Sequence, residues 1–288
     1  MRLKIGYSIS MPLDSTSEVP EYSVEDMELI KSLSKQFPCI QIMFSKTSIS
    51  KQELKSIKNI ISPYKNIFVH ASYQINMGGE LIPSQTDLYN IGIDILIKEI
   101  EYGIKIGMER GGIVLHTGKN VKKQYDPDHV YNNMVKFIIE LFRKLKSKKI
   151  KINLLIETPA GQGGEMLYKL EELVEFILRF KNLDFYSNLG LCLDTCHIFQ
   201  AGYDLNNDKI INQIHKILEP VKDKIQLIHL NDSFHQVGQH LDRHEQIGQG
   251  YIKIDQLIKF IFPYRNVPMI LETKPPYDKQ IALINKIK

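Results

Sequence analysis

The chain has 288 residues, of which 43% are hydrophobic and 24% charged, a composition that allows a full core and argues against disorder. With 37 basic and 33 acidic residues, the formal net charge is +4, which permits a polyanionic partner without requiring one. The 3 cysteines are too few for a disulfide framework, which favours a reducing compartment. The sequence shows neither a secretory signal nor a run near the roughly 20 apolar residues of a membrane helix. We therefore expect an intracellular protein without a membrane partner.

Short apolar runs alternate with longer segments of helical periodicity along the whole sequence. The predicted strands are Leu3–Ile9, Cys39–Phe44, Ile67–Val69, Ile113–Leu115, Ile152–Ile156, Leu189–Leu193, Ile225–Leu230 and Val267–Leu271. The predicted helices are Val24–Phe37, Lys51–Ile61, Thr86–Ile106, His129–Leu145, Glu165–Phe180, Asp208–Leu218, Ile254–Phe262 and Lys279–Ile287. Because parallel neighbours need a crossover connection, this alternation predicts an α/β fold, a single (β/α)8 TIM barrel over residues 1–288.

Most of the predicted strands end in a side chain that can bind a metal ion. These strand-end residues are His70, His116, Glu157, Asp194, His229 and Glu272. In a TIM barrel the C-terminal ends of the strands meet on one face, so these residues are expected to form one polar site there. An open doubly wound sheet, the rival fold, spreads them along an edge and does not gather them.

Two loops add further candidate ligands. His197 follows Asp194 by three residues, and Asp242 and His244 are two apart, so in an extended loop they point the same way. Imidazole and carboxylate together favour zinc, and the enlarged set exceeds what two ions need at about four ligands each. Three ions that share a bridging carboxylate would fit.

Each of these histidines, taken alone, is more often a core or surface residue than a ligand. Asp232, His235 and His240 lie outside the set and keep that interpretation. It fails for the set as a whole, because burying so many ionisable groups on one face without an ion costs several kcal/mol each. The basic run from Arg143 to Lys151 precedes the fifth strand, on the opposite face, and is interpreted as a solvated helix end rather than a nucleic-acid contact.

Six segments carry a resemblance to a known family. They are Val69 to Asn76, Ile156 to Gly163, Cys192 to Asp204, His229 to Ser233, Asp242 to Gly250 and Ile270 to Thr273. They resemble the motif blocks of the endonuclease IV family of zinc-dependent apurinic/apyrimidinic (AP) endonucleases. The Asp-Thr-Cys-His and Asp-Arg-His blocks are highly specific in combination, and the match runs over nearly the whole chain.

The resemblance implies a TIM barrel with three zinc ions and a division of the ligands among them. His70, His116 and Glu157 hold the first zinc in this scheme. Glu157 bridges to the second zinc, which Asp194, His229 and Glu272 also bind. His197, Asp242 and His244 hold the third.

The resemblance also implies the reaction. The expected substrate is duplex DNA containing an abasic site, and the phosphodiester 5′ to that site is hydrolysed to leave a 3′-hydroxyl, a step of base excision repair. A hydroxide on the first two zincs is the expected nucleophile, steered by Glu157, while the third zinc orients the phosphate. The chain is expected to act as a monomer.

The sequence departs from the family pattern at several positions, none of them a ligand. Ser8 stands where a histidine is common, and Thr117 and Thr158 replace a proline and an asparagine. Among the expected DNA contacts, Tyr73, Gln74, Lys46 and Arg243, the tyrosine matches the family, while Gln74 replaces an apolar wedge and the Lys46 loop lacks an inserting arginine.

Two other functions remain open from the residues. A sugar isomerase or epimerase on a related metal barrel needs fewer ligands, for one or two ions, and a base or lysine for proton transfer. A non-catalytic binder of DNA lesions does not need a complete ligand set.

Overall fold

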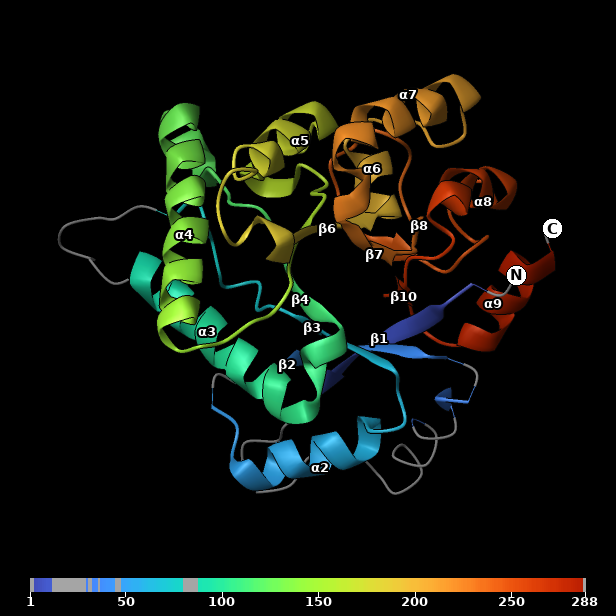
Figure 1. Cartoon of the computed structure of the whole chain (residues 1–288). Coiled ribbons are helices and arrows are strands. Elements are labelled where there is room, and N and C mark those ends of the chain that lie inside the picture. Colours follow the sequence, from blue (N-terminus) through green and yellow to red (C-terminus); the bar gives the residue numbers. More distant parts are fainter. Residues whose placement is uncertain are drawn as a thin grey trace.

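The computed structural model describes residues 3–11, 30, 33–35, 37–44, 48–79 and 88–286. Its centre is a closed barrel of parallel strands in the order β1-β10-β7-β6-β5-β4-β3-β2 (Figure 1). The strands are β1 Ile5–Met11, β2 Cys39–Phe44, β3 Asn66–His70, β4 Gly112–Leu115, β5 Leu154–Glu157, β6 Leu189–Asp194, β7 Ile225–His229 and β10 Met269–Leu271. The predicted (β/α)8 barrel and all of its predicted strands are confirmed, with ends displaced by a few residues.

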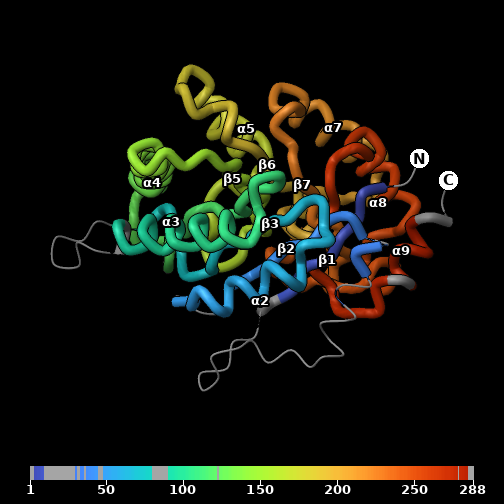
Figure 2. The backbone as a smooth tube through the Cα atoms, turned by 60° about the horizontal axis from the view of Figure 1, so that its bottom comes forward, coloured from blue at the N-terminus to red at the C-terminus, as the bar shows by residue number. Residues whose placement is uncertain are grey.

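Helices surround the barrel between successive strands (Figures 1 and 2). They are α2 Lys51–Ile61, α3 Leu88–Ile106, α4 Pro127–Ser147, α5 Leu170–Leu178, α6 Thr195–Gln200, α7 Asp208–Leu218, α8 Ile254–Ile261 and α9 Tyr277–Lys286. Short 3-10 turns lie at Met108–Arg110, Val121–Lys123, Gln162–Gly164, Tyr186–Asn188, Glu219–Lys224 and Phe262–Tyr264, and a small hairpin pairs β8 Asp232–Ser233 with β9 His244–Glu245. The predicted helix Val24–Phe37 lies largely outside the described residues, as do the first residues of the predicted helix Thr86–Ile106.

The helices differ from the prediction at two places: one begins later than predicted, and one was not predicted. The predicted helix Glu165–Phe180 begins instead at Leu170, because Glu165 is fixed in the preceding loop. Its Oε2 accepts the backbone N–H groups of Gly161 and Gln162, both at 3.0 Å, and its Oε1 lies 3.1 Å from Lys119 Nζ. The helix α6, directly after β6, was not predicted; Asp194 caps its N-terminus by accepting the N–H of His197 at 2.8 Å.

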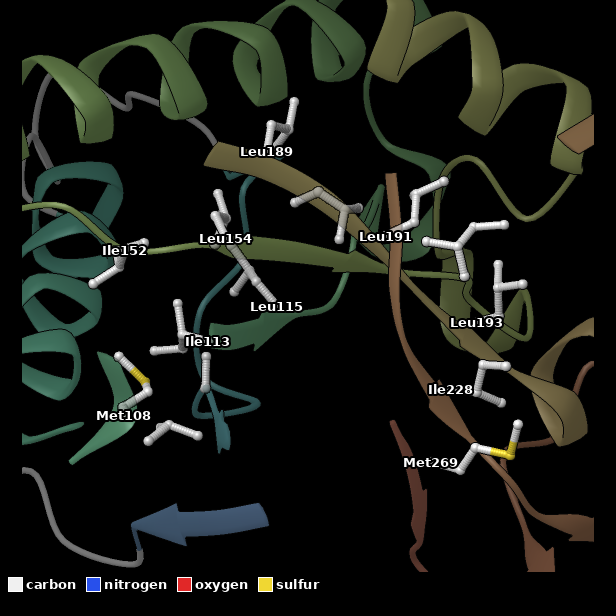
Figure 3. Packing of buried hydrophobic residues seen from close by; sticks show 14 of the residues in the cluster. Met108, Ile113, Leu115, Ile152, Leu154, Leu189, Leu191, Leu193, Ile228 and Met269 are labelled. Carbon is white, nitrogen blue, oxygen red and sulfur yellow. The ribbon is translucent and has the colours of Figure 1, made fainter. Parts of the chain in front are cut away.

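The strand side chains form two apolar layers. The outer one packs between strands and helices, as Ile113, Leu115, Leu191 and Leu193 show in Figure 3. The inner one fills the barrel with one residue from each of seven strands: Cys39, Phe68, Val114, Leu155, Cys192, Leu227 and Ile270, which are all buried. The barrel is therefore a packed core whose polar residues begin one layer above this plug.

The basic run from Arg143 to Lys151 covers the last residues of α4 and the segment after it, at the end of the barrel where β5 begins. Several of its cations form surface ion pairs: Lys146 Nζ lies 2.6 Å from Asp184 Oδ2, and Lys148 Nζ lies 2.9 Å from Glu101 Oε1. These contacts match the interpretation of a solvated helix end. Among the described residues, no helix has both the length and the apolar character needed to cross a membrane.

Candidate metal centre

Six candidate ligands follow the inner apolar layer of the barrel, here called the plug, at a constant spacing along their strands. His70, His116, Glu157, Asp194, His229 and Glu272 each come two residues after the plug residue of their strand. Since side chains alternate across a strand with a period of two, each of them also faces the barrel interior, one layer nearer to the C-terminal end. The convergence that the sequence predicted is thus produced by strand periodicity together with barrel closure.

Among the described residues, four groups of candidate ligands come together there, each with its ligand atoms within 4.8 Å of one another. The group of Glu157, Cys192 and His229 overlaps with the larger group around His229, so three distinct groups remain. In the first, His70 Nε2 lies 3.4 Å and His116 Nε2 lies 3.3 Å from Glu157 Oε2. That carboxylate oxygen is buried and has no hydrogen-bond partner. A buried carboxylate oxygen without a donor, faced by two imidazole nitrogens, fits a cation between the three side chains.

The second group shares Glu157 with the first and adds Asp194, His229 and Glu272. His229 Nδ1 lies 2.7 Å from Glu157 Oε1, 3.0 Å from Glu272 Oε2 and 3.7 Å from Asp194 Oδ2. Three carboxylates around one imidazole nitrogen leave an excess of negative charge in a buried space. The sharing of Glu157 is what a bridging carboxylate requires.

The third group lies beside the second and is built from the end of β6, the helix α6, and the hairpin strand β9 with the loop that precedes it. It contains Asp194, His197 and His244. Asp242 belongs with them, because its Oδ1 lies 3.0 Å from His197 Nε2 and 3.3 Å from His244 Nε2. His244 Nε2 also lies 3.4 Å from Asp194 Oδ2, so Asp194 joins the third group to the second.

The loop that carries Asp242 and His244 is held by Asp232. The carboxylate of Asp232 accepts the N–H groups of Gly248 and Gly250 at 3.0 Å and that of Ile252 at 2.9 Å. Gly248 has a φ of 83°, which favours glycine at that turn. Asp232 is therefore a structural residue that anchors the loop, as its exclusion from the ligand set predicted.

Burial and charge shift the pKa values of these groups in opposite directions. Burial together with the neighbouring histidines lowers the pKa of His116 to about 4, although Glu157 opposes the shift, so His116 is neutral and free to bind a cation at neutral pH. Burial alone would raise the pKa of Glu272, but the adjacent His229 lowers it to about 2. Asp194 differs, because burial dominates there and its pKa is raised. This mixture of charged and neutral donors in one buried space suits zinc, which binds imidazole nitrogen and carboxylate oxygen.

Sequence reasoning missed two buried amides that bind the candidate ligands. Asn231 Nδ2 donates to Asp194 Oδ2 at 2.7 Å, and its Oδ1 accepts the N–H of Glu272 at 2.9 Å. Gln41, on β2, contacts both His229 and Glu272. A signal for Gln41 existed, since it comes two residues after the plug residue Cys39, at the position where the other strands carry a ligand.

The expected DNA contacts differ in their placement. Tyr73 is 61% exposed, and the centroid of its ring lies 5.1 Å from that of His70 and 5.2 Å from that of His116, beside the first group. Gln74, beside it, is exposed, and so is Arg243, between Asp242 and His244. Lys46 lies outside the described residues.

The comparisons with known proteins agree with this geometry. Residues 29–287 match the family of xylose isomerase-like TIM barrels. A relative described as a probable endonuclease 4, from Staphylococcus saprophyticus subsp. saprophyticus, is 34% identical over 237 residues, which cover 77% of this chain and 75% of the relative.

Solved structures show the same fold. The endonuclease IV of Thermus thermophilus has a TM-score of 0.69 at 21% identity and covers 99% of this chain and 97% of its own. A D-tagatose 3-epimerase-like protein has a TM-score of 0.70 at 18% identity, with 99% of both chains covered. Because nucleases and epimerases share the barrel, the sequence relatives decide between them, and the chain belongs to the endonuclease IV family within the xylose isomerase-like TIM barrels.

Proposed function

We propose that the chain is a DNA-repair endonuclease that hydrolyses the phosphodiester 5′ to an abasic site in duplex DNA and leaves a 3′-hydroxyl. The observation that carries the proposal is the set of three contiguous ligand groups, joined by Glu157 and by Asp194. A single metal ion needs about four ligands, so this arrangement exceeds the requirement of a mononuclear site. Family membership supports the same reaction class.

The residues divide among three zinc ions in this proposal. The first takes His70, His116 and Glu157; the second takes Glu157, Asp194, His229 and Glu272; the third takes His197, Asp242 and His244. When bound, zinc brings the pKa of water to near neutrality and neutralises phosphate charge.

The protein's own groups position the reactants. Glu157, fully buried between the first two groups, is placed to bridge two cations and thereby to steer an attacking water held between them. The exposed ring of Tyr73 lies over the first group, where it can stack on the nucleotide next to the lesion. Gln74 and Arg243, both exposed, are proposed to contact the DNA, and Lys46 stays a prediction from the sequence. A monomer is proposed as the active form, because the three groups need no ligand from a second chain.

The decisive experiment is cleavage of a duplex that carries one abasic analogue, by protein stripped of metal and then restored with zinc. The zinc-restored protein is expected to nick the strand immediately 5′ to the analogue, and the stripped protein is expected to be inactive. Binding of the duplex without nicking by the zinc-loaded protein would instead indicate a lesion binder. Absence of binding, together with one or two zincs per chain, would favour a sugar isomerase or epimerase.

DNA binding has its own test. Each phosphate neutralised by the protein contributes about −0.9 to the slope of log affinity against log salt concentration. We expect a steep slope for the abasic duplex. A flat response would argue against DNA as the substrate.

A further inference from the structure

Gln41 is a buried amide that contacts two members of the second ligand group at once. It lies on β2 and is 0% exposed. His229 Nε2 lies 2.8 Å from its Oε1, and its Nε2 donates to Glu272 Oε1 at 2.7 Å. Its Nε2 also donates to Ser8 Oγ on β1 at 3.2 Å.

The chemistry of the partners fixes the orientation of this amide. An ionised carboxylate only accepts hydrogen bonds, so the NH₂ group of Gln41 must face Glu272 and its carbonyl oxygen must face His229. His229 therefore donates from Nε2. Its other ring nitrogen, Nδ1, is the one that faces Glu157 and Glu272, and it is left with a lone pair for a cation once it loses its proton.

We propose that Gln41 is a positioning residue, which sets the tautomer of His229 and the rotation of Glu272 and so preorganises the second zinc site. The inference rests on the proposed function to the extent that this group binds zinc. Groups that orient metal ligands in this way typically change metal affinity by about 10- to 100-fold. Gln41 binds two ligands with one side chain, so its loss releases both.

The barrel explains why a glutamine occupies this position. β1 and β2 contribute none of the proposed ligands, yet they close the ring beside β10, the strand that ends before Glu272. Ser8 and Gln41 are register partners across these two strands. β2 thus supplies, through Gln41, hydrogen bonds to ligands on β7 and after β10 in place of a ligand of its own, and Ser8 on β1 accepts a further hydrogen bond from Gln41.

The test compares Gln41→Met with a matched control, Asn133→Leu. Methionine keeps the length and apolar volume of glutamine but neither accepts from His229 nor donates to Glu272. Asn133, on α4, is also buried and donates to Gly79 O at 3.3 Å, and its partners are not proposed ligands. Zinc affinity is measured by competition with a chromophoric chelator, alongside the zinc-dependent rise in melting temperature.

The expected result is a loss of about 10- to 100-fold in affinity for one zinc in Gln41→Met, with a smaller zinc-dependent rise in melting temperature. Asn133→Leu is expected to lower the melting temperature of the zinc-free protein and to leave its zinc affinity unchanged. Equal zinc affinity in Gln41→Met and the parent chain would overturn the inference while leaving the proposed function intact. A parent chain that binds no zinc would overturn the proposed function and the inference with it.

A second variant covers the case in which Gln41→Met does not fold. Gln41→Asn keeps the amide but is one methylene shorter, so it cannot reach His229 and Glu272 simultaneously. The same weakening of one zinc site is expected, together with a changed visible spectrum of the cobalt-substituted protein, since the geometry of one site alters. An unchanged spectrum and unchanged zinc affinity in this variant would contradict the positioning role.

Discussion

The charged side chains at the two ends of the barrel differ in their exposure to solvent. At the N-terminal end, cations near the end of α4 form surface ion pairs; in the Lys146–Asp184 pair the side chains are 77% and 69% exposed. At the C-terminal end, Glu157, Asp194 and His229 are completely buried in the same small space. Water screens the first set, whereas the second set needs an internal counter-charge.

The contrast shows which charges the fold must balance. Exposed pairs contribute roughly 0 to 1 kcal/mol each, so their presence on α4 requires no special explanation. A buried carboxylate oxygen without a donor, such as Glu157 Oε2, costs about 1–3 kcal/mol or more. The polar end of this barrel therefore suits bound cations, whereas the charges at the opposite end are exposed to solvent.

The largest effect is expected for Glu157→Gln. An amide keeps the shape of the carboxylate but cannot bridge two cations or balance their charge. Nicking of the abasic duplex should fall on the order of 10³-fold or more, with an unchanged circular dichroism spectrum. Full activity of this variant would contradict the bridging role of Glu157.

Asp242→Asn should have the next largest effect on activity. Asp242 contacts His197 and His244 in the third group, and burial of its carboxylate is more than offset by these histidines, which lower its pKa. The variant should lose one zinc per chain by metal analysis, and nicking should drop about 10²-fold. Retention of all bound zinc would place Asp242 outside the metal centre.

Asp232→Ala tests how far the loop anchor matters for stability. The variant leaves three backbone N–H groups of residues 248–252 without their acceptor. The free energy of unfolding should fall by about 3 kcal/mol in urea denaturation. A change no larger than that of a surface substitution would show that the loop is held by other contacts.

Glu99 offers a buried carboxylate outside the ligand groups. It accepts the N–H of Ser72 at 3.1 Å, and burial raises its pKa to about 7. Because the folded protein binds this proton more tightly than the unfolded chain, its contribution to stability is complete below pH 4.5 and is lost as the pH rises through 7. In the Glu99→Gln variant, the free energy of unfolding should fall less between pH 4.5 and pH 7 than in the parent chain. The expected difference is on the order of 2 kcal/mol, measured from denaturation curves at these pH values. An unchanged pH dependence would show that Glu99 is ionised in the folded protein.

The smallest effect is expected at the N-terminal end. Lys146→Ala and Lys148→Ala remove exposed partners and should change the free energy of unfolding by about 0.5 kcal/mol or less. The salt dependence of DNA binding should also stay the same. A reduced salt slope in either variant would mean that DNA reaches the basic run.

The sequence predicted those features for which the local residue pattern and the closed barrel impose the same arrangement. Apolar runs ending in His, Glu or Asp predicted both the strands and the convergence of their last residues, because barrel closure leaves little freedom for those side chains. The pattern was weaker for Gln41, whose role depends on contacts with strands that lie far away in sequence. It was also weaker at Glu165, where hydrogen bonds to a preceding loop override helical periodicity.

The central claim is that the buried polar end of the barrel binds three zinc ions. Anomalous diffraction at the zinc absorption edge, from crystals of the zinc-loaded protein, tests it most directly. Three anomalous peaks are expected, one within each ligand group, with Glu157 between the first two. A single peak, or peaks away from these groups, would contradict it.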